Sequence, residues 1–137
     1  MIQKDRKYTR EHEWVKVSGD VAVIGLSHHA VEQLGDIVFV EIPPVGTQIK
    51  QMEPCGVIES VKATSEIFSP LSGKVIEANT KLMAELNGAE NPDFAPQVIN
   101  EDPYEGGWLL KIKPSNLAEL DALFTPEGYD EMLKSLV

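Results

Sequence analysis

The chain has 137 residues, 42% of them hydrophobic, which suits one compact domain with a substantial core. Its formal net charge of −10, from 22 acidic and 12 basic residues, argues against binding to nucleic acid phosphates. No apolar run approaches the ~20 residues needed to span a bilayer, and Met1–Arg10 lacks the apolar stretch of a secretory signal. We therefore expect a soluble protein of the cytoplasm, or of an organellar matrix after processing, without nucleic acid or membrane partners.

The composition also argues against a metal site. Cys55 is the only cysteine, so one chain can form neither a disulfide nor a cysteine-based metal site. His28 and His29 are adjacent, and adjacent residues on a helix point about 100° apart, which makes them a poor pair of ligands. We expect no bound metal.

The first half of the chain predicts a hairpin, a short helix and two strands. Ser18-Gly19-Asp20 separates two β-branched runs, as in a β-hairpin. Ser27 is suited to cap a helix that ends at Gly35, and Pro43-Pro44 ends the strand that follows. The expected elements are strands at 15–17, 21–24, 37–42 and 47–49, and a helix at 28–34.

The second half predicts more short strands and then a helical tail. Asn116-Leu117-Ala118-Glu119 has the spacing of a capping box, and Thr125-Pro126 is typical of a helix start. That last helix should run to Leu136 and place Tyr129 and Leu136 on one apolar face. The expected elements are strands at 55–59, 65–69, 74–78 and 108–112, a helical turn or two within 80–86, a loop at 87–96 and helices after 115.

Short strands with closely spaced turns indicate a sandwich or barrel rather than parallel βαβ units. We expect one domain over residues 1–137, with residues 115–137 as a C-terminal helical extension packed on it.

Lys62 stands alone between the strands predicted at 55–59 and 65–69, where the chain should reverse. A Schiff-base lysine would need a pKa lowered by burial or by a nearby cation, whereas Glu59 and Glu66 favour the charged amine. An exposed turn also offers no substrate pocket. Composition alone favours an ordinary surface lysine in a hairpin over an amine presented for modification.

The segment Glu59-Ser60-Val61-Lys62-Ala63 resembles the lipoyl-attachment site of the H protein of the glycine cleavage system. Gly73 follows the lysine at the distance where that family also keeps a glycine. Biotin carriers flank their lysine with methionines, which this chain lacks at both positions. Three further blocks resemble the family in the same order and cover most of the chain: Tyr8–Trp14, Glu32–Val40 and Asn100–Leu109.

The resemblance implies a mainly β fold of the lipoyl-domain type. This would be a flattened β-barrel or sandwich (a barrel-sandwich hybrid), with a short helix after the first hairpin and C-terminal helices. It also implies that lipoic acid, bound as an amide to Lys62, is the cofactor.

The same resemblance implies a carrier without catalytic activity of its own. Lipoyl-Lys62 would take the aminomethyl group of glycine from glycine decarboxylase (P protein) to the aminomethyltransferase (T protein). Lipoamide dehydrogenase (L protein) would then re-oxidise the dithiol, and a lipoate ligase or lipoyl transferase would attach the lipoyl group.

Four residues match positions of the cleft in which this family shelters the loaded arm: Glu13, His29, Glu11 and Glu66. Carboxylates and an imidazole would suit a basic aminomethyl nitrogen. The family more often has a smaller residue in place of Glu11. The alternative is that Glu11 and Glu66 are solvated surface acids and that His29 merely faces water.

Glu59 and Gly73 match positions implied in recognition by the lipoylating enzyme. Gly73 has a second explanation, since a tight bend after Ser72 needs a flexible backbone.

The segment Thr80–Gln97 is longer than is usual in the family. A longer loop often marks altered partners, although added loop length costs little stability. This leaves a second hypothesis open, an H-protein-like lipoyl carrier of another pathway, such as sulfur oxidation with heterodisulfide-reductase-like enzymes.

Overall fold

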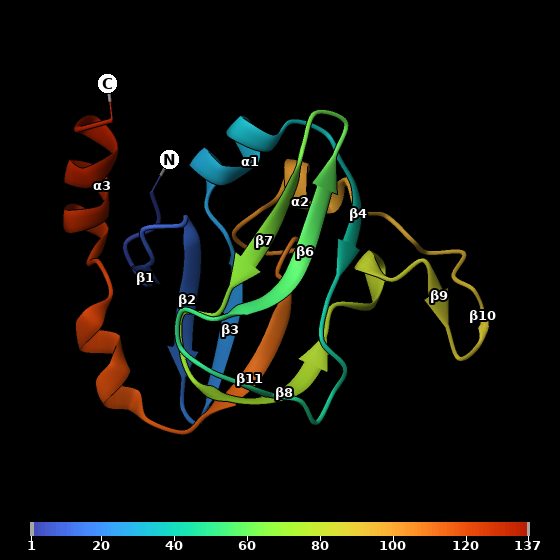
Figure 1. Cartoon of the computed structure of the whole chain (residues 1–137), viewed down its shortest axis with the longest axis horizontal. Helices are drawn as coiled ribbons and strands as arrows, with labels where there is room; N and C mark the ends of the chain where they lie inside the picture. Colours follow the sequence, from blue (N-terminus) through green and yellow to red (C-terminus); the bar gives the residue numbers. More distant parts are fainter. Residues whose placement is uncertain (1, 137) are drawn as a thin grey trace.

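The computed structural model describes residues 2–136 and is mainly β, with short helices at its margins (Figure 1). Its strands are β1 (Lys7–Tyr8), β2 (Glu13–Ser18), β3 (Val21–Leu26), β4 (Ile37–Glu41), β5 (Gln48–Ile49), β6 (Pro54–Ser60), β7 (Thr64–Phe68), β8 (Gly73–Ala78), β9 (Glu85–Leu86), β10 (Ala89–Glu90) and β11 (Leu110–Pro114). Its helices are α1 (His28–Leu34), α2 (Val98–Glu101) and α3 (Pro126–Lys134), with 3₁₀ segments η1 (Thr80–Leu82) and η2 (Leu117–Ala122).

Two antiparallel sheets enclose the core. The larger has the strand order β1-β2-β3-β11-β8-β5 and the smaller has the order β4-β6-β7. Apolar residues of both sheets meet in one cluster, with Ile24 and Ile112 from the larger and Ile58 and Ile67 from the smaller. The expected mainly β fold is confirmed in its sandwich form, because neither sheet closes into a barrel within residues 2–136.

Helix α1 has the boundaries that the sequence predicts. The Ser27 hydroxyl accepts a hydrogen bond from Ala30 N (3.3 Å) at its start. At its end Gly35 adopts a φ of +80° and donates from its N–H to Val31 O (3.0 Å). A positive φ favours glycine, so the chain can leave α1 sharply here and enter β4.

The segment 80–97 differs from the expected turn and loop. Its helical part is only η1, and β9 and β10 form a hairpin that projects from the body (Figure 1). Asn87 and Gly88 have φ angles of 54° and 79°, and two positive φ angles are typical of a two-residue hairpin turn. Helix α2, which follows this hairpin, was also not predicted.

The C-terminal segment begins its last helix as predicted. The Thr125 hydroxyl accepts from Gly128 N (3.0 Å), and the ring of Tyr129 stacks on Tyr8 with centroids 4.4 Å apart. Two other expectations were wrong. Leu136 lies beyond α3 with 59% of its surface exposed. The carboxylate of Glu119 accepts hydrogen bonds from the Ser72 backbone and hydroxyl (both 2.8 Å), so it does not close a capping box.

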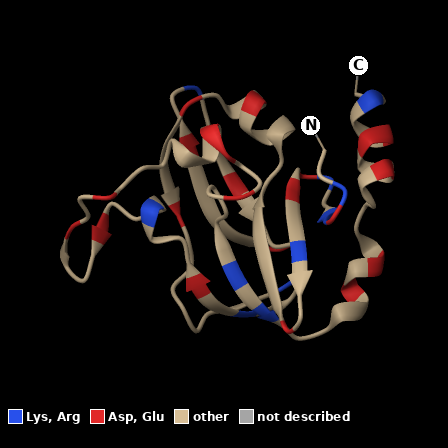
Figure 2. Cartoon of the chain, turned by 180° about the vertical axis from the view of Figure 1, so that it is seen from behind, with Lys and Arg blue, Asp and Glu red and all other residues tan. Residues whose placement is uncertain are grey.

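None of the helices within residues 2–136 has the length and hydropathy needed to cross a bilayer. Figure 2 shows acidic residues along α3 and on the hairpin β9–β10, while basic residues gather on strands of the larger sheet.

Candidate functional site

The turn that carries Lys62 joins β6 to β7 at one end of the sandwich (Figure 1). The strand register ends at Glu59 opposite Thr64. Ser60 braces the turn, because its N–H donates to Ala63 O (2.8 Å) and its hydroxyl accepts from Lys62 N and Ala63 N (both 3.1 Å). The Lys62 side chain is exposed. The sequence therefore places the Lys62 amine in water on a hydrogen-bonded turn, as predicted.

The turn also contacts the segment that follows α1. Val61 N donates to Asp36 O (3.0 Å). The aliphatic stem of Lys62 lies over Gly35, since a β-carbon at Gly35 would stand 3.1 Å from Lys62 Cε. The C-terminal end of α1 is thus the surface on which the lysine side chain rests.

Glu13 is buried between the two sheets and only 1% exposed. One carboxylate oxygen accepts from the Thr9 hydroxyl (2.5 Å), and the other accepts from Phe68 N in β7 (3.1 Å). Burial raises the pKa of Glu13 to about 7, although these two hydrogen bonds favour the charged form. Glu13 therefore lies behind the surface rather than on an open cleft wall.

His29 belongs to a cluster centred on His12. Their ring centroids are 4.5 Å apart, and His12 Nδ1 lies 2.8 Å from the Tyr129 hydroxyl, which is 2.7 Å from Ser27 Oγ. Burial, and next the neighbouring His29, lower the pKa of His12. Sequence reasoning gave His12 no role. The backbone of His12 has a φ of 76°, a conformation that the sequence pattern did not predict.

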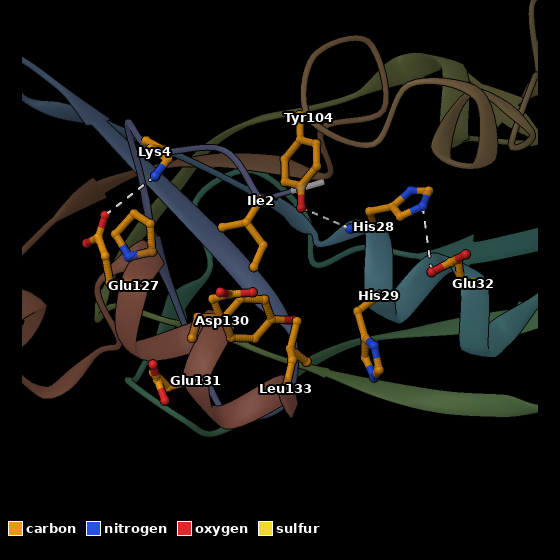
Figure 3. Close-up of a pocket in the computed structure, with 12 residues that line it drawn as sticks. Ile2, Lys4, His28, His29, Glu32, Tyr104, Glu127, Asp130, Glu131 and Leu133 are labelled. Atoms are coloured by element: carbon orange, nitrogen blue, oxygen red, sulfur yellow. Dashed lines mark hydrogen bonds and ion pairs between the residues drawn. The ribbon is translucent and has the colours of Figure 1, made fainter. Parts of the chain in front are cut away.

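A hollow of about 550 Å³ opens beside α1, between that helix, α3 and the N-terminal segment (Figure 3). The half-buried His29 and the exposed His28 both line it, and the ring of His28 turns toward Glu32, with Nε2 3.6 Å from Oε1. Its rim is mainly acidic, with one lysine among the charged residues Lys4, Glu32, Glu127, Asp130 and Glu131.

Of the four predicted cleft residues, His29 alone lines this hollow. Glu11 is exposed and close enough to Glu13 to raise the pKa of that carboxyl slightly. Glu66 lines a separate hollow of about 320 Å³ beside Glu41. Glu11 and His29 both lie near His12, while Glu66 lies apart in another hollow.

The two residues expected in enzyme recognition differ in their exposure. Glu59 is half-buried on β6 next to the lysine turn. Gly73 is buried, and a β-carbon there would collide with the carbonyl oxygen of Lys113 in β11. The explanation by a flexible bend was wrong, because Gly73 has no positive φ and glycine is needed for close backbone approach.

Within residues 2–136, no group of three or more His, Cys, Asp or Glu side chains is arranged to hold a metal ion. Cys55 is a free thiol, and burial raises its pKa to about 12, so it is not a reactive thiolate.

The fold and the site define a β-sandwich protein that presents one lysine on a braced hairpin turn. The family model described as glycine cleavage H-protein matches residues 6–136. The chain belongs to this family. Nothing in the comparisons with known proteins favours a sulfur-oxidation carrier.

Curated relatives and a solved structure agree with this assignment. The glycine cleavage system H protein of Carboxydothermus hydrogenoformans is 46% identical over 134 residues, which are 98% of this chain and 95% of that protein. The one of Bacillus subtilis is 47% identical over 131 residues, 96% of this chain and 95% of that protein. The crystal structure of a glycine cleavage system H protein from Mycobacterium marinum has a TM-score of 0.80 at 36% identity, and covers 97% of this chain and 99% of that one.

Proposed function

We propose that this protein is the lipoyl carrier of a glycine cleavage system, with the lipoyl group attached to Lys62 Nζ. It would take the aminomethyl group of glycine from glycine decarboxylase to the aminomethyltransferase, and lipoamide dehydrogenase would re-oxidise it. The observation that carries the proposal is the exposed lysine on the β6–β7 turn within Glu59–Ala63, in a chain of the H-protein family.

The residues around Lys62 fit a lipoyl amide. The Lys62 amine is exposed, and the backbone N–H groups of residues 60–63 already have acceptors, so modification requires no rearrangement of the turn. Amide formation removes the ammonium charge and extends the side chain to an arm on the order of 10–15 Å by ordinary bond lengths. When bound, the dithiolane supplies reversible thiol chemistry and the group-carrying sulfur. The protein supplies the tether, which raises the local concentration of the arm at each docked enzyme.

The hollow beside α1 is suited to shelter the end of a loaded arm. Gly35, where the lysine stem lies, is six positions from His29, which corresponds to about 9 Å along a helix. An arm that follows α1 would therefore reach His29. The acidic rim would attract a basic aminomethyl nitrogen, and the imidazole could accept a hydrogen bond from it.

Glu11 and Glu13 would act together in this arrangement. Glu11 is exposed but does not line the hollow, so it would act on the nitrogen at longer range, while Glu13 is a buried carboxyl that accepts hydrogen bonds from Thr9 and Phe68. A cationic amine nearby would lower the pKa of Glu13 and favour its charged form. Glu66 could join only through a different path of the arm, since it lines the other hollow.

Glycine decarboxylase provides the direct test of the pathway. We expect the lipoylated protein to support exchange of the glycine carboxyl carbon with bicarbonate, and the Lys62→Arg variant to support none. Lys50→Arg, a change at an exposed lysine elsewhere, should behave like the wild type. If the lipoylated protein supports no exchange, the glycine assignment is wrong, even where mass analysis shows the lipoyl group on Lys62.

A further inference from the structure

Asn100 lies in the short helix α2, and its side-chain amide forms hydrogen bonds with the backbone of the residues before and after Asp36. Its Nδ2 donates to Gly35 O, and its Oδ1 accepts from Ile37 N, both at 2.9 Å. A carbonyl needs a donor and an N–H needs an acceptor, so these partners determine which way the amide faces. The side chain therefore fixes the segment 35–37 from more than 60 positions away in the sequence.

The same segment supports the lysine turn at three points. Asp36 O accepts from Val61 N (3.0 Å), and Ile37 pairs with Ser60 in the β4–β6 register. The third point is Gly35, over which the Lys62 stem lies. One side chain, that of Asn100, thus holds the backbone on which both the main chain and the side chain of the lysine turn rest.

We propose that Asn100 is a positioning residue for Lys62. It keeps residues 35–37 in place, so that Nζ leaves the turn in one direction, along the end of α1. Without its amide, the segment loses one hydrogen bond on each side of residue 36, at Gly35 and at Ile37. Gly35 has a φ of +80°, and a glycine is free to adopt other conformations once these bonds are absent. This inference rests on the proposed function, because it concerns how Lys62 is presented to a lipoylating enzyme and to the cleft.

The substitution Asn100→Asp tests this role with little change in shape. The carboxylate still accepts from Ile37 N, but its second oxygen faces Gly35 O without a proton to donate. We expect kcat for lipoylation by a lipoate ligase to fall about tenfold with KM changed less than about twofold, since docking is kept while the amine is misplaced. Hydrogen exchange at the Val61 amide should be faster by a similar factor.

Asn91→Asp is the matched control. Asn91 Nδ2 donates to Thr80 O (2.9 Å) and Met83 O (2.8 Å), and its side-chain oxygen accepts from Asp93 N (3.0 Å). The change therefore removes two donated hydrogen bonds, one more than Asn100→Asp removes, at the base of the β9–β10 hairpin, far from the lysine turn in Figure 1. Lipoylation and Val61 exchange should stay within about twofold of wild type.

A second pair of variants tests the surface under the lysine stem. Gly35→Ala and Gly88→Ala share backbone strain, with φ angles of +80° and +79°, but only the new methyl at residue 35 meets Lys62. We expect Gly35→Ala to slow lipoylation and Gly88→Ala to leave it unchanged.

The outcomes separate this inference from the proposed function. If Asn100→Asp folds and is lipoylated at the wild-type rate, the positioning role of Asn100 is wrong. The carrier assignment still holds in that case, provided that the wild type is lipoylated on Lys62. Equal losses in Asn100→Asp and Asn91→Asp also overturn it, because they would report general destabilisation. A wild-type protein that accepts no lipoyl group refutes the proposed function itself.

Discussion

Glu13 should make the folded protein less stable as the pH rises from about 5 to about 7. Burial raises its pKa from 4.5 to about 7, so between these values the folded protein keeps a proton that the unfolded chain has lost. Rising pH then favours the unfolded chain. Acids with lowered pKa values, such as Asp5 beside Arg6, have the opposite effect and act only at lower pH.

The size of the effect follows from the two pKa values. A pKa difference of one is worth about 1.4 kcal/mol, so the Glu13 carboxyl can cost at most about 3 kcal/mol of unfolding free energy at pH 8. His12 opposes it, since its lowered pKa means that the unfolded chain binds the extra proton below about 6.5. Glu13 must therefore be isolated by comparison with a variant.

The assay is urea unfolding at pH 5 and pH 8, followed by the fluorescence of the buried Trp14. Between these pH values the wild type should lose about 2.5 kcal/mol more than Glu13→Gln, whose amide does not titrate. The exposed Glu66→Gln should match the wild type. If the wild type and Glu13→Gln show the same pH dependence, the pKa of Glu13 is not raised and the argument from burial fails.

Three further substitutions test other parts of the structure. Gly73→Ala should lower the unfolding free energy by at least about 2 kcal/mol more than Gly19→Ala, because the new methyl at residue 73 meets the β11 backbone and the one at residue 19 meets nothing. Equal losses of the two variants in thermal melts would refute this. Tyr129→Phe removes a hydroxyl with two partners and should cost about 1–3 kcal/mol in urea unfolding, so an unchanged midpoint would exclude those bonds. His29→Ala should leave lipoylation intact but shorten the lifetime of the aminomethyl-loaded arm, and a decay rate equal to that of the wild type would remove His29 from the cleft.

Local signals predicted the elements near the lysine well. Ser27 and Gly35 mark the ends of α1 in the sequence because capping depends on neighbouring backbone groups alone. The turn at Lys62 was likewise expected from two β-rich runs with one break between them.

Other features depend on contacts that no local pattern records. Glu119 has capping-box spacing, but its carboxylate accepts hydrogen bonds from the Ser72 backbone and hydroxyl instead of from the backbone at the start of its own helix. The bonds of Asn100 to Gly35 and Ile37 join segments far apart in the sequence, so spacing could not reveal them. The β9–β10 hairpin is different, because Asn87-Gly88 is a strong turn signal that the loop assignment overlooked.

The cleft residues show the same limit. Resemblance named Glu13 and His29, but it could not show that Glu13 is buried behind the surface or that His12 lies between His29 and Tyr129. Burial and ring contacts follow from how β2, α1 and α3 meet, which is a property of the whole fold.

Mass analysis of the intact protein after incubation with lipoate, ATP and a lipoate ligase tests the central claim most directly. We predict a single lipoyl adduct that peptide mapping places on Lys62 and that is absent from Lys62→Arg but present in Lys50→Arg. An adduct that persists in Lys62→Arg, or no adduct on the folded wild type, would contradict the account.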